Sequence, residues 1–559
     1  MFRLVRRLGP LKPTTLLKSR FYSGAQPKPP NTDILIKSLI FTAGSIVGGY
    51  LYSSEVQQST KSTLPIDQVT SPEYANKEQL AQAIEAVKKV FRKNTPDYDE
   101  SLIINSSQED KDSHSDTYFN SYHPEPNEEP QYVIYPRSTE EVSEVLKICN
   151  KYKVPVVPIT GKSSLEGHFI NTRRGVCIDI SLMDEVIELN QQDLDIKVQA
   201  GLGWETLADY LSEYNLLFPI DPGPGASIGG ICANNASGTN ASRYGECYKN
   251  VLSLTVVLAD GTIIKTKNRP RKSSAGYNLN SLFIGSEGTL GIITEATLKL
   301  YVKPKIERVA VVPFKSIQDA ANSVNSYLLN GMQLNAIELL DDKMMSCINA
   351  SGETSRKWTE APTLFLKIGG SNDKVVQSTV DQVKTLSSQH NSIDFQFARN
   401  DEETEELWSA RKVALWSTIN QGRVTDPSIK LWTTDAAVPI SKLPQFLEET
   451  KEDIANNGLE NTLVAHIGDG NAHSFILYKP DQYKLAEKVV DNMVRRAIAY
   501  EGTCTGEHGV GLGKRQFLLE EVGGDAVDLM RNIKLHLDPS RILNPDKIFQ
   551  IDPKESRSH

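Results

Sequence analysis

Two histidines flank a short polar turn in the last fifth of the chain. The stretch HIGDGNAH places His466 and His473 on either side of Asp469-Gly470, a dipeptide typical of two-residue β-hairpin turns. We expect His466 to lie directly opposite His473, and directly opposed residues share one sheet face with Cβ atoms about 4.5–5.5 Å apart. Two imidazoles so placed can bind one metal ion. A polar cross-strand pair without metal is the alternative.

A carboxylate that could complete such a site follows in the stretch GEHGVG, where Glu507 and His508 are adjacent. Two histidines and one carboxylate form a three-ligand set that leaves coordination positions open. Neighbouring side chains of an extended chain point to opposite sides. If Glu507 faces the metal, His508 can therefore face a substrate, and its ordinary pKa of about 6.5 suits a general base near neutral pH.

Three stretches rich in small residues precede these histidines, at residues 158–169, 221–245 and 276–300. Their bare backbone is costly in chain entropy, and it lets successive N–H groups surround an anion such as a pyrophosphate. A plain surface loop is the alternative for the first stretch, and close packing of two backbones is the alternative for the second. Neither a Walker motif nor a well-formed G-x-G-x-x-G after a first strand occurs, which disfavours P-loop and Rossmann folds.

In this order and spacing, the three stretches resemble the FAD-binding domain of the vanillyl-alcohol oxidase family. HIGDGNAH and GEHGVG narrow the resemblance to the branch with D-lactate and D-2-hydroxyglutarate dehydrogenases and glycolate oxidase. The resemblance covers about residues 100–552. It implies an α+β fold, in which an FAD-binding domain of the vanillyl-alcohol oxidase type is combined with an α+β substrate (cap) domain.

The resemblance also assigns the residues that bind FAD. Some relatives link the flavin covalently through a histidine of the first stretch, where this chain has Lys162, so we expect non-covalent FAD. His168, further along, is interpreted as a structural partner. The residues carried over by motif position are Pro158, Thr160, Gly161, Ser163, Ser164, Gly223, Gly229, Gly230, Ser237, Gly238, Glu287, Gly288 and Ile292.

Further roles follow from the same resemblance. His466, His473 and Glu507 would bind one divalent metal, zinc in the first instance with manganese or iron as alternatives, and His508 would be the catalytic base. The metal would hold the hydroxyl and carboxylate oxygens of a D-2-hydroxy acid.

A cation is also needed for the substrate carboxylate. Arg411, in LWSARKVALW, matches the family position, and a guanidinium can bind a carboxylate through two hydrogen bonds. Lys430 is a second substrate-binding candidate, and Asp435 is a weaker, structural one. A surface arginine on a helix is the alternative for Arg411.

The implied reaction is FAD-dependent oxidation of D-lactate to pyruvate, with electrons passed to cytochrome c. D-2-hydroxyglutarate and glycolate are alternative substrates, although Phe475 is apolar where hydroxyglutarate enzymes tend to be polar, which favours lactate. A flavin-free metallohydrolase would leave the glycine-rich stretches unexplained. A membrane-tethered binding protein without catalysis would leave the histidine and glutamate cluster unexplained.

The N-terminus has a different character. Residues 1–32 contain seven basic side chains and no acidic one, which predicts a mitochondrial transit peptide, with a disordered basic tail as the alternative. Residues 38–54 are uncharged and glycine-containing, so 34–54 is predicted to be a membrane anchor or sorting segment, with a buried helix as the alternative. We therefore expect a mitochondrial protein at the inner membrane.

Length and composition set the remaining limits. The net charge of −9 over 559 residues gives no indication of nucleic-acid binding, and the six cysteines form no CxxC pair. Strand patterns such as 154–159 and 363–370 alternate with helical patterns such as 138–152. The expected divisions are a linker and N-terminal helical region (55–125), the FAD-binding domain (126–304), the substrate/cap domain (305–500), and a C-terminal segment that carries active-site residues and returns to the FAD domain (501–559).

Overall fold

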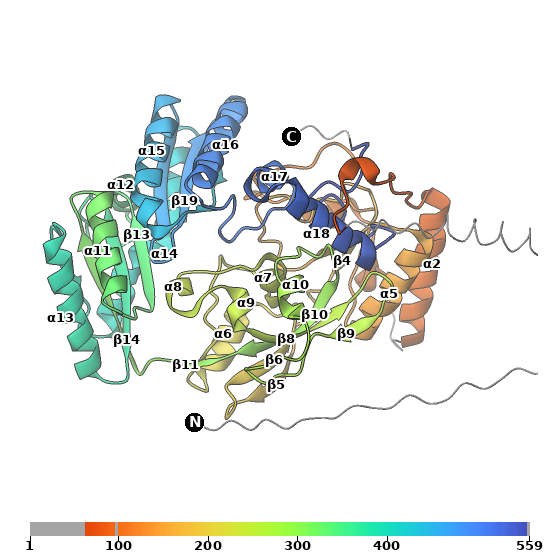
Figure 1. Cartoon of the computed structure of the whole chain (residues 1–559), viewed down its shortest axis with the longest axis horizontal. Helices are drawn as coiled ribbons and strands as arrows, with labels where there is room; N and C mark the ends of the chain where they lie inside the picture. The colour runs from red at the N-terminus through yellow and green to blue at the C-terminus, as the bar shows by residue number, and fades with distance from the viewer. Residues whose placement is uncertain (1–61, 95–98, 556–559) are drawn as a thin grey trace, which may run out of the picture. The chain divides into compact units, whose positions relative to one another are not determined.

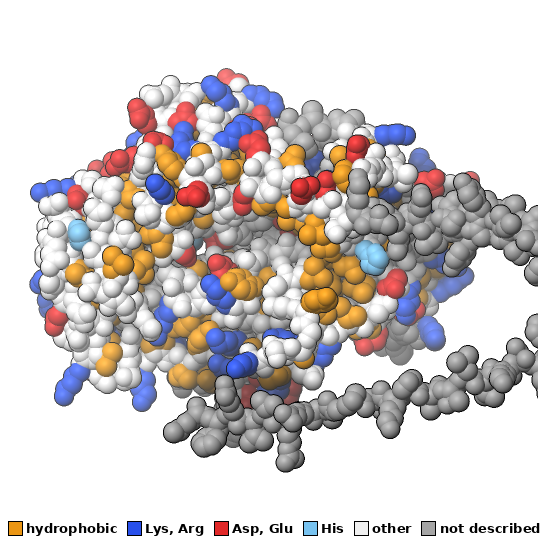
Figure 2. All heavy atoms as spheres, in the orientation of Figure 1, with side chains coloured by type: hydrophobic (Ala, Val, Ile, Leu, Met, Phe, Trp, Pro, Cys, Tyr) orange, Lys and Arg blue, Asp and Glu red, His pale blue; other side chains and the backbone are white. Residues whose placement is uncertain are grey.

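Three larger β-sheets, one two-stranded ribbon and the helices that pack on them make up the part of the chain that the computed structural model describes, residues 62–94 and 99–555 (Figure 1). The predicted transit peptide and the 34–54 segment lie outside these residues. Within the described residues, no helix has both the length and the apolar character that crossing a bilayer requires. On the face shown in Figure 2, basic and acidic side chains are interspersed.

The first sheet is built around a strand–helix–strand unit. Two of its strands run parallel to β4, and β1 pairs antiparallel with β2, giving the order β1-β2-β4-β3. Ser138 caps α5 by accepting the N–H of Glu141. The elements are β1 (Ile104–Asn105), β2 (Tyr132–Ile134), α5 (Thr139–Tyr152), β3 (Val156–Ile159) and β4 (Val176–Asp179).

A helix from the expected linker region belongs to the same core. α2 (Lys77–Asn94) packs against α5 and buries Ala83, Ile84 and Val87. This helix therefore belongs to the core that includes α5.

The second sheet is antiparallel throughout, in the order β5-β6-β10-β8-β9. Its strands are β5 (Val186–Asn190), β6 (Asp195–Gln199), β8 (Val251–Val257), β9 (Ile263–Lys265) and β10 (Ile292–Lys299). A small ribbon pairs β7 (Leu216–Leu217) with β11 (Tyr301–Val302). The short helices that connect these elements are α3 (Glu100–Ile103), α4 (Gln108–Ser113), α6 (Trp204–Ser212), α7 (Ile228–Asn234), α8 (Ala241–Tyr244), α9 (Cys247–Asn250) and α10 (Leu279–Phe283).

The third sheet is also antiparallel, in the order β15-β12-β14-β13-β18-β19-β16, with β17 paired to β19. Its strands are β12 (Ile306–Pro313), β13 (Ala336–Leu340), β14 (Thr363–Gly370), β15 (Gln396–Phe397), β16 (Lys430–Thr433), β17 (Ala436–Ala437), β18 (Glu460–His466) and β19 (Asn471–Tyr478).

Helices cover both faces of this sheet. One face packs against α11 (Ile317–Leu329), α13 (Asp373–Gln389) and α15 (Leu443–Asn456), and the other packs against α12 (Asp342–Ser351) and α14 (Asp401–Thr425). Because successive residues of a strand point to opposite faces, alternate residues of each strand face α14.

The hairpin between β18 and β19 differs from the predicted register. His466 pairs with Asn471, and His473 pairs with Val464, so direct opposition of the two histidines is wrong. Four residues, 467–470, connect the strands in place of the expected two. At Gly470 the backbone φ is +89°, and a Cβ there would lie 2.2 Å from the carbonyl oxygen of Val438. The two histidines still share a face, as diagonal neighbours, because residues 471 and 473 point the same way.

After α16 (Tyr483–Ala499), the chain returns to the first sheet through α17 (Arg515–Val522) and α18 (Gly524–Leu537) (Figure 1). Val156 of β3 donates its N–H to Ile542 and accepts one from Asn544. The Lys534 ammonium group of α18 is buried and donates to the carbonyl oxygens of Thr289 and Leu543 and to the carboxylate of Asp538. The C-terminal segment is thus held against the third glycine-rich stretch and against β3.

Removing the Lys534 ammonium should loosen this closure. Lys534→Met leaves the buried Asp538 carboxylate without its cation, and breaking a buried pair from one side costs about 3–5 kcal/mol. We expect a lower urea midpoint of unfolding, followed by circular dichroism. Lys488→Met, at an exposed position of α16, is the matched control and should leave the midpoint unchanged. Equal midpoints for both variants would contradict a closing role for Lys534.

Candidate active site

A cavity of about 660 Å³ is lined by residues of the three glycine-rich stretches and of the GEHGVG loop. This volume lies in the range of about 300–1,000 Å³ that is usual for cofactor sites. Ser237 and Gly238 are the two predicted FAD-binding residues that do not line it. The predicted residues that do line it are Pro158, Thr160, Gly161, Ser163, Ser164, Gly223, Gly229, Gly230, Glu287, Gly288 and Ile292.

The walls of this cavity require glycine where two stretches meet. A Cβ on Gly161, whose φ is +63°, would lie 2.7 Å from the carbonyl oxygen of Gly225. A Cβ on Gly288, whose φ is +71°, would lie 2.4 Å from the ring of Pro158. The hydroxyl of Thr160 is buried at this wall and has no hydrogen-bond partner among the described residues. Bare backbone and a free hydroxyl fit a polar ligand such as FAD.

Three predicted FAD-binding residues have other partners. Ser237 donates its hydroxyl to Oε2 of Glu507 at 2.5 Å. At Gly238 a Cβ would lie 2.4 Å from Oδ1 of Asp221, so this glycine permits close packing of two chain segments. Glu287 lines the cavity, but its two carboxylate oxygens accept the backbone N–H groups of residues 510 and 511 at 2.6 and 2.8 Å. The second and third stretches are therefore bonded to the GEHGVG loop.

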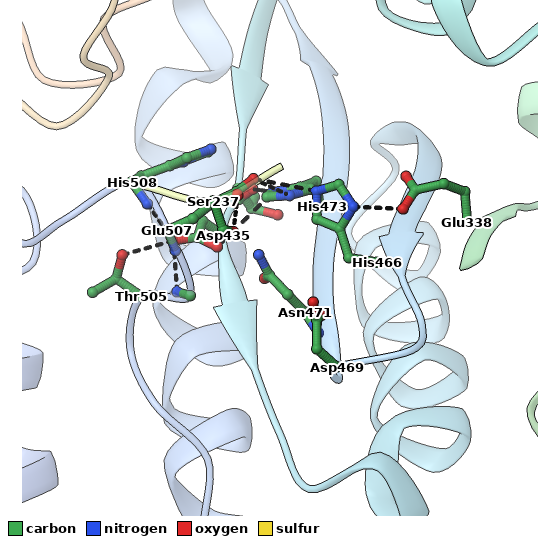
Figure 3. Close-up of polar contacts among 12 residues, drawn as sticks. Ser237, Glu338, Asp435, His466, Asp469, Asn471, His473, Thr505, Glu507 and His508 are labelled. Carbon is green, nitrogen blue, oxygen red and sulfur yellow. Dashed lines mark hydrogen bonds and ion pairs between the residues drawn. The ribbon is translucent and has the colours of Figure 1, made fainter. Parts of the chain in front are cut away.

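The three predicted metal ligands come together on the sheet face that packs against α14 (Figure 3). Nε2 of His466 lies 3.3 Å from Oε1 of Glu507, and Nε2 of His473 lies 3.0 Å from the same oxygen. Glu507 also lines the cavity described above, so the carboxylate that faces both histidines borders that cavity.

The protonation of the two histidines follows from their other contacts. Nδ1 of His473 lies 2.9 Å from the carbonyl oxygen of Thr434, and Nδ1 of His466 lies 2.7 Å from a carboxylate oxygen of Glu338. Both oxygens are acceptors, so both Nδ1 atoms must carry hydrogen. In the neutral rings, both Nε2 lone pairs then point at the same oxygen of Glu507 and need a cation between them. This orientation, with Nδ1–H held by an oxygen, is the usual one for metal-bound histidine, so the donor set fits a divalent ion.

In the protein without metal, protons balance this cluster. Burial lowers the pKa of His466, but the carboxylates of Glu338 and Glu507 outweigh it and hold that pKa well above its ordinary value. Burial raises the pKa of Glu507, yet His466 and His473 keep it well below the usual range. A divalent ion would take over the charge that the proton carries here.

His508 borders the cavity beside this cluster. Its ring stacks on that of His473, with centroids 5.1 Å apart and planes 17° apart. Enclosure by the protein lowers the pKa of His508 to about 4, although Asp435 opposes this shift. The ordinary pKa expected from the sequence is therefore not found. The ring is neutral at pH 7, and its Nδ1 has no hydrogen-bond partner in the described part of the chain.

Asp435 has a larger role than the sequence indicated. Its Oδ2 accepts hydrogen bonds from the hydroxyl of Thr505 and from the backbone N–H groups of residues 506–508, at 2.6 to 3.0 Å. Although burial raises its pKa, Lys514 and the histidines hold it below the ordinary value. One ionised carboxylate thus fixes the loop that carries Glu507 and His508.

Neither of the predicted substrate cations, Arg411 and Lys430, is among the residues that line the cavity. Nε of Arg411 lies 2.8 Å from Glu338, whose other oxygen holds His466. No described residue bonds the terminal nitrogens of Arg411. Lys430 is exposed at the start of β16, with its ammonium 5.7 Å from the ring centre of Tyr118, which borders the cavity. The sequence analysis did not identify Glu338 as a site residue. Its position as the one acidic residue in the apolar strand AIELL is the signal that could have indicated it.

Comparison with known proteins adds two family matches. Residues 130–267 match the FAD binding domain, and residues 303–548 match the C-terminal domain of FAD linked oxidases. The second match includes both halves of the histidine and glutamate cluster.

The curated relatives cover most of the chain. Mitochondrial D-lactate dehydrogenase [cytochrome] of Kluyveromyces lactis is 54% identical, over 92% of this chain and 90% of that protein. D-lactate dehydrogenase [cytochrome] 1 of Saccharomyces cerevisiae is 52% identical, over 88% and 84%. Mitochondrial D-2-hydroxyglutarate dehydrogenase of Danio rerio is 30% identical, over 74% and 78%.

Solved structures share the fold at low identity. 4-Ethylphenol oxidase from Gulosibacter chungangensis superposes with a TM-score of 0.70 at 18% identity, over 87% of this chain and all of that chain. p-Cresol methylhydroxylase gives 0.70 at 16% identity, over 88% of this chain and 100% of that chain. The predicted fold class is confirmed. The chain belongs to the family of FAD-linked oxidases, in the branch that contains the mitochondrial cytochrome-type D-lactate dehydrogenases.

Proposed function

We propose that this protein oxidises D-lactate to pyruvate with FAD as its cofactor and passes the electrons to cytochrome c. The observation that carries the proposal is that Glu507 and His508 line the same cavity as the predicted FAD-binding residues. Glu507 at the same time faces His466 and His473. The sequence identity of 54% to a D-lactate dehydrogenase supports D-lactate as the substrate in preference to D-2-hydroxyglutarate or glycolate.

The substrate end of the cavity has an apolar lining that suits lactate. Leu415 and Trp416 of α14 and Phe475 of β19 border it. A methyl group gains from contact with such side chains, whereas a second carboxylate would lose hydration without a partner. The terminal nitrogens of Arg411 would then bind the single carboxylate of the substrate, with Lys430 near the opening.

The proton of the substrate hydroxyl would move to His508. Its imidazole is neutral at pH 7, and the ionised Asp435 beside it stabilises the positive charge that forms on protonation. When bound, FAD supplies the acceptor for the hydride that leaves Cα, so that the 2-oxo acid is formed. When bound at His466, His473 and Glu507, a divalent ion supplies a Lewis acid for the substrate oxygens. Zinc is our first choice, with manganese or iron as alternatives.

Attachment and location complete the proposal. Lys162 stands where some relatives have the linking histidine, and its ammonium group lies 3.5 Å from Nδ1 of His114. Because this position has no histidine, the flavin would be held without a covalent bond. The basic residues 1–32 and the names of the relatives support a mitochondrial location. Residues 34–54 would attach the protein to the inner membrane or direct it there.

A substrate panel tests the proposed activity. The purified protein should reduce cytochrome c with D-lactate at a higher kcat/KM than with L-lactate, glycolate or D-2-hydroxyglutarate, because a single carboxylate and a small apolar group fit the cavity. The reaction is followed by the absorbance of reduced cytochrome c. A higher kcat/KM with D-2-hydroxyglutarate would identify the protein as a D-2-hydroxyglutarate dehydrogenase instead. A colourless purified protein would contradict FAD as the cofactor.

The metal cluster can be tested by ligand replacement. His466→Ala, His473→Ala and Glu507→Gln should each lose the bound divalent metal, because a set of three ligands cannot spare one. Metal is measured by inductively coupled plasma mass spectrometry, and bound FAD by its absorbance. His536→Ala, at an exposed position of α18, is the control and should keep both. Parent-level metal in all three ligand variants would exclude this cluster as the site.

His508 should be separable from the ligands. His508→Ala is expected to keep FAD and metal but to slow flavin reduction by D-lactate by about 10²–10⁴-fold, the usual effect of general acid–base catalysis. Stopped-flow absorbance measures the rate. Arg411→Ala, in contrast, should mainly raise the D-lactate concentration needed for half-maximal reduction. Flavin reduction at the parent's rate in His508→Ala would assign the proton to another group.

A further inference from the structure

Two residues that are far apart in the sequence, His168 and Asn544, meet on the wall of the FAD cavity. His168 closes the first glycine-rich stretch, and Asn544 lies in the C-terminal segment that runs beside β3. Both border the cavity and are more than nine-tenths buried. The proposed function gives neither of them a role.

The contacts of Asn544 fix the orientation of its amide. Its Nδ2 lies 2.6 Å from the carbonyl oxygen of Glu287 and 3.2 Å from that of His168. Carbonyl oxygens only accept, so the NH₂ group must face them and the two amide positions cannot be exchanged. Oδ1 is left buried without a donor among the described residues. Oδ1 is therefore an unused acceptor, which an N–H or O–H group of a bound ligand could satisfy.

His168 has the complementary deficit. Neither of its ring nitrogens makes a hydrogen bond to a described residue. Nε2 lies 3.3 Å from Glu287, but the angle does not make a hydrogen bond, and both oxygens of that carboxylate already accept N–H groups of the GEHGVG loop. A neutral imidazole always has one N–H, so His168 has a donor to offer a bound group. Unsatisfied buried polar groups of this kind are uncommon in native proteins.

The position of the pair indicates which part of FAD it meets. A Cβ on Gly509 would lie 2.7 Å from Nε2 of His168, so the residue that follows His508 rests directly on this imidazole. The flavin ring is the part of FAD that must approach the substrate held at His508. In that ring system the pyrimidine edge offers one N–H donor, N3–H, between two carbonyl acceptors.

We propose that Asn544 and His168 bind the pyrimidine edge of the flavin, with Asn544 as acceptor from N3–H and His168 as donor to a flavin carbonyl. The inference rests on FAD being the cofactor. Reduction places more electron density on this edge, so a donor there favours reduced flavin. His168 is thus a positioning residue for the cofactor that also raises its reduction potential.

Flavin release and exchange measure both contacts. The holoenzyme of each variant is diluted, and the appearance of free FAD is followed by fluorescence. His168→Ala and Asn544→Ala should each weaken FAD retention by about tenfold, the effect of one buried hydrogen bond. His168→Gln, which keeps a donor, should recover part of the loss. Asn391→Ala removes another asparagine with a left-handed backbone, which is exposed and does not line the cavity, and should retain FAD like the parent.

Exchange against 3-methyl-FAD, which lacks N3–H, isolates the Asn544 contact. The parent should retain FAD over the analogue by about tenfold, and Asn544→Ala should lose this preference. Redox titration should give His168→Ala a lower midpoint potential than the parent. These two readouts would not change if the residues only supported the fold. Should Asn544→Ala not fold, the parent's preference and the His168 variants still decide the proposal.

The outcomes separate this inference from the proposed function. A parent that binds no FAD would overturn the proposed function itself. A parent that binds FAD and oxidises D-lactate, but retains 3-methyl-FAD as well as FAD, would overturn the Asn544 contact alone. Parent-like retention and potential in His168→Ala would overturn the His168 contact. An unchanged preference in Asn544→Ala would place another group, such as a ribityl hydroxyl, against this amide.

Discussion

The carboxylate of Glu507 is the interaction on which the arrangement of the site depends. Its Oε1 faces the Nε2 atoms of His466 and His473 on the third sheet, and its Oε2 accepts the hydroxyl of Ser237 from the second glycine-rich stretch. One side chain therefore joins the third sheet to the wall of the FAD cavity. A shift of either part would separate the histidines from the cofactor, because a hydrogen bond tolerates only a few tenths of an ångström.

This arrangement buries several charged groups, and each of them is stabilised by neighbouring groups of opposite charge or by hydrogen-bond donors. Glu338 is fully buried between His466 and Arg411, and Asp435 is fully buried beside Lys514 and four hydrogen-bond donors of one loop. An isolated buried carboxylate would take up a proton, whereas these two remain ionised because cations and N–H groups surround them. The cluster is thereby preorganised before any metal or substrate binds.

Much of the site could be predicted from local sequence. Eleven of the thirteen residues assigned to FAD line one cavity, because glycine-rich turns are specified by their own backbone requirements. The predicted placement of His466 and His473 on one sheet face is found, although the direct cross-strand pairing from which it was predicted is wrong. A longer turn shifted the register by two residues, and the period of two along a strand kept both imidazoles on one side. The hydrogen bond between Ser237 and Glu507 could not be predicted from local sequence, because the two residues are 270 positions apart in the chain.

The sequence by itself determined which chemical groups the site contains: two imidazoles and a carboxylate close together, a further imidazole beside them, and small residues that leave room for a cofactor. It did so because residue types and short spacings set donor atoms and turns. The tertiary structure decided which nitrogen of each histidine carries hydrogen, the lowered pKa of His508, and the roles of Glu338, Asp435 and Asn544. Those properties arise from burial and from contacts between segments far apart in the chain, which exist only after the sheets have packed.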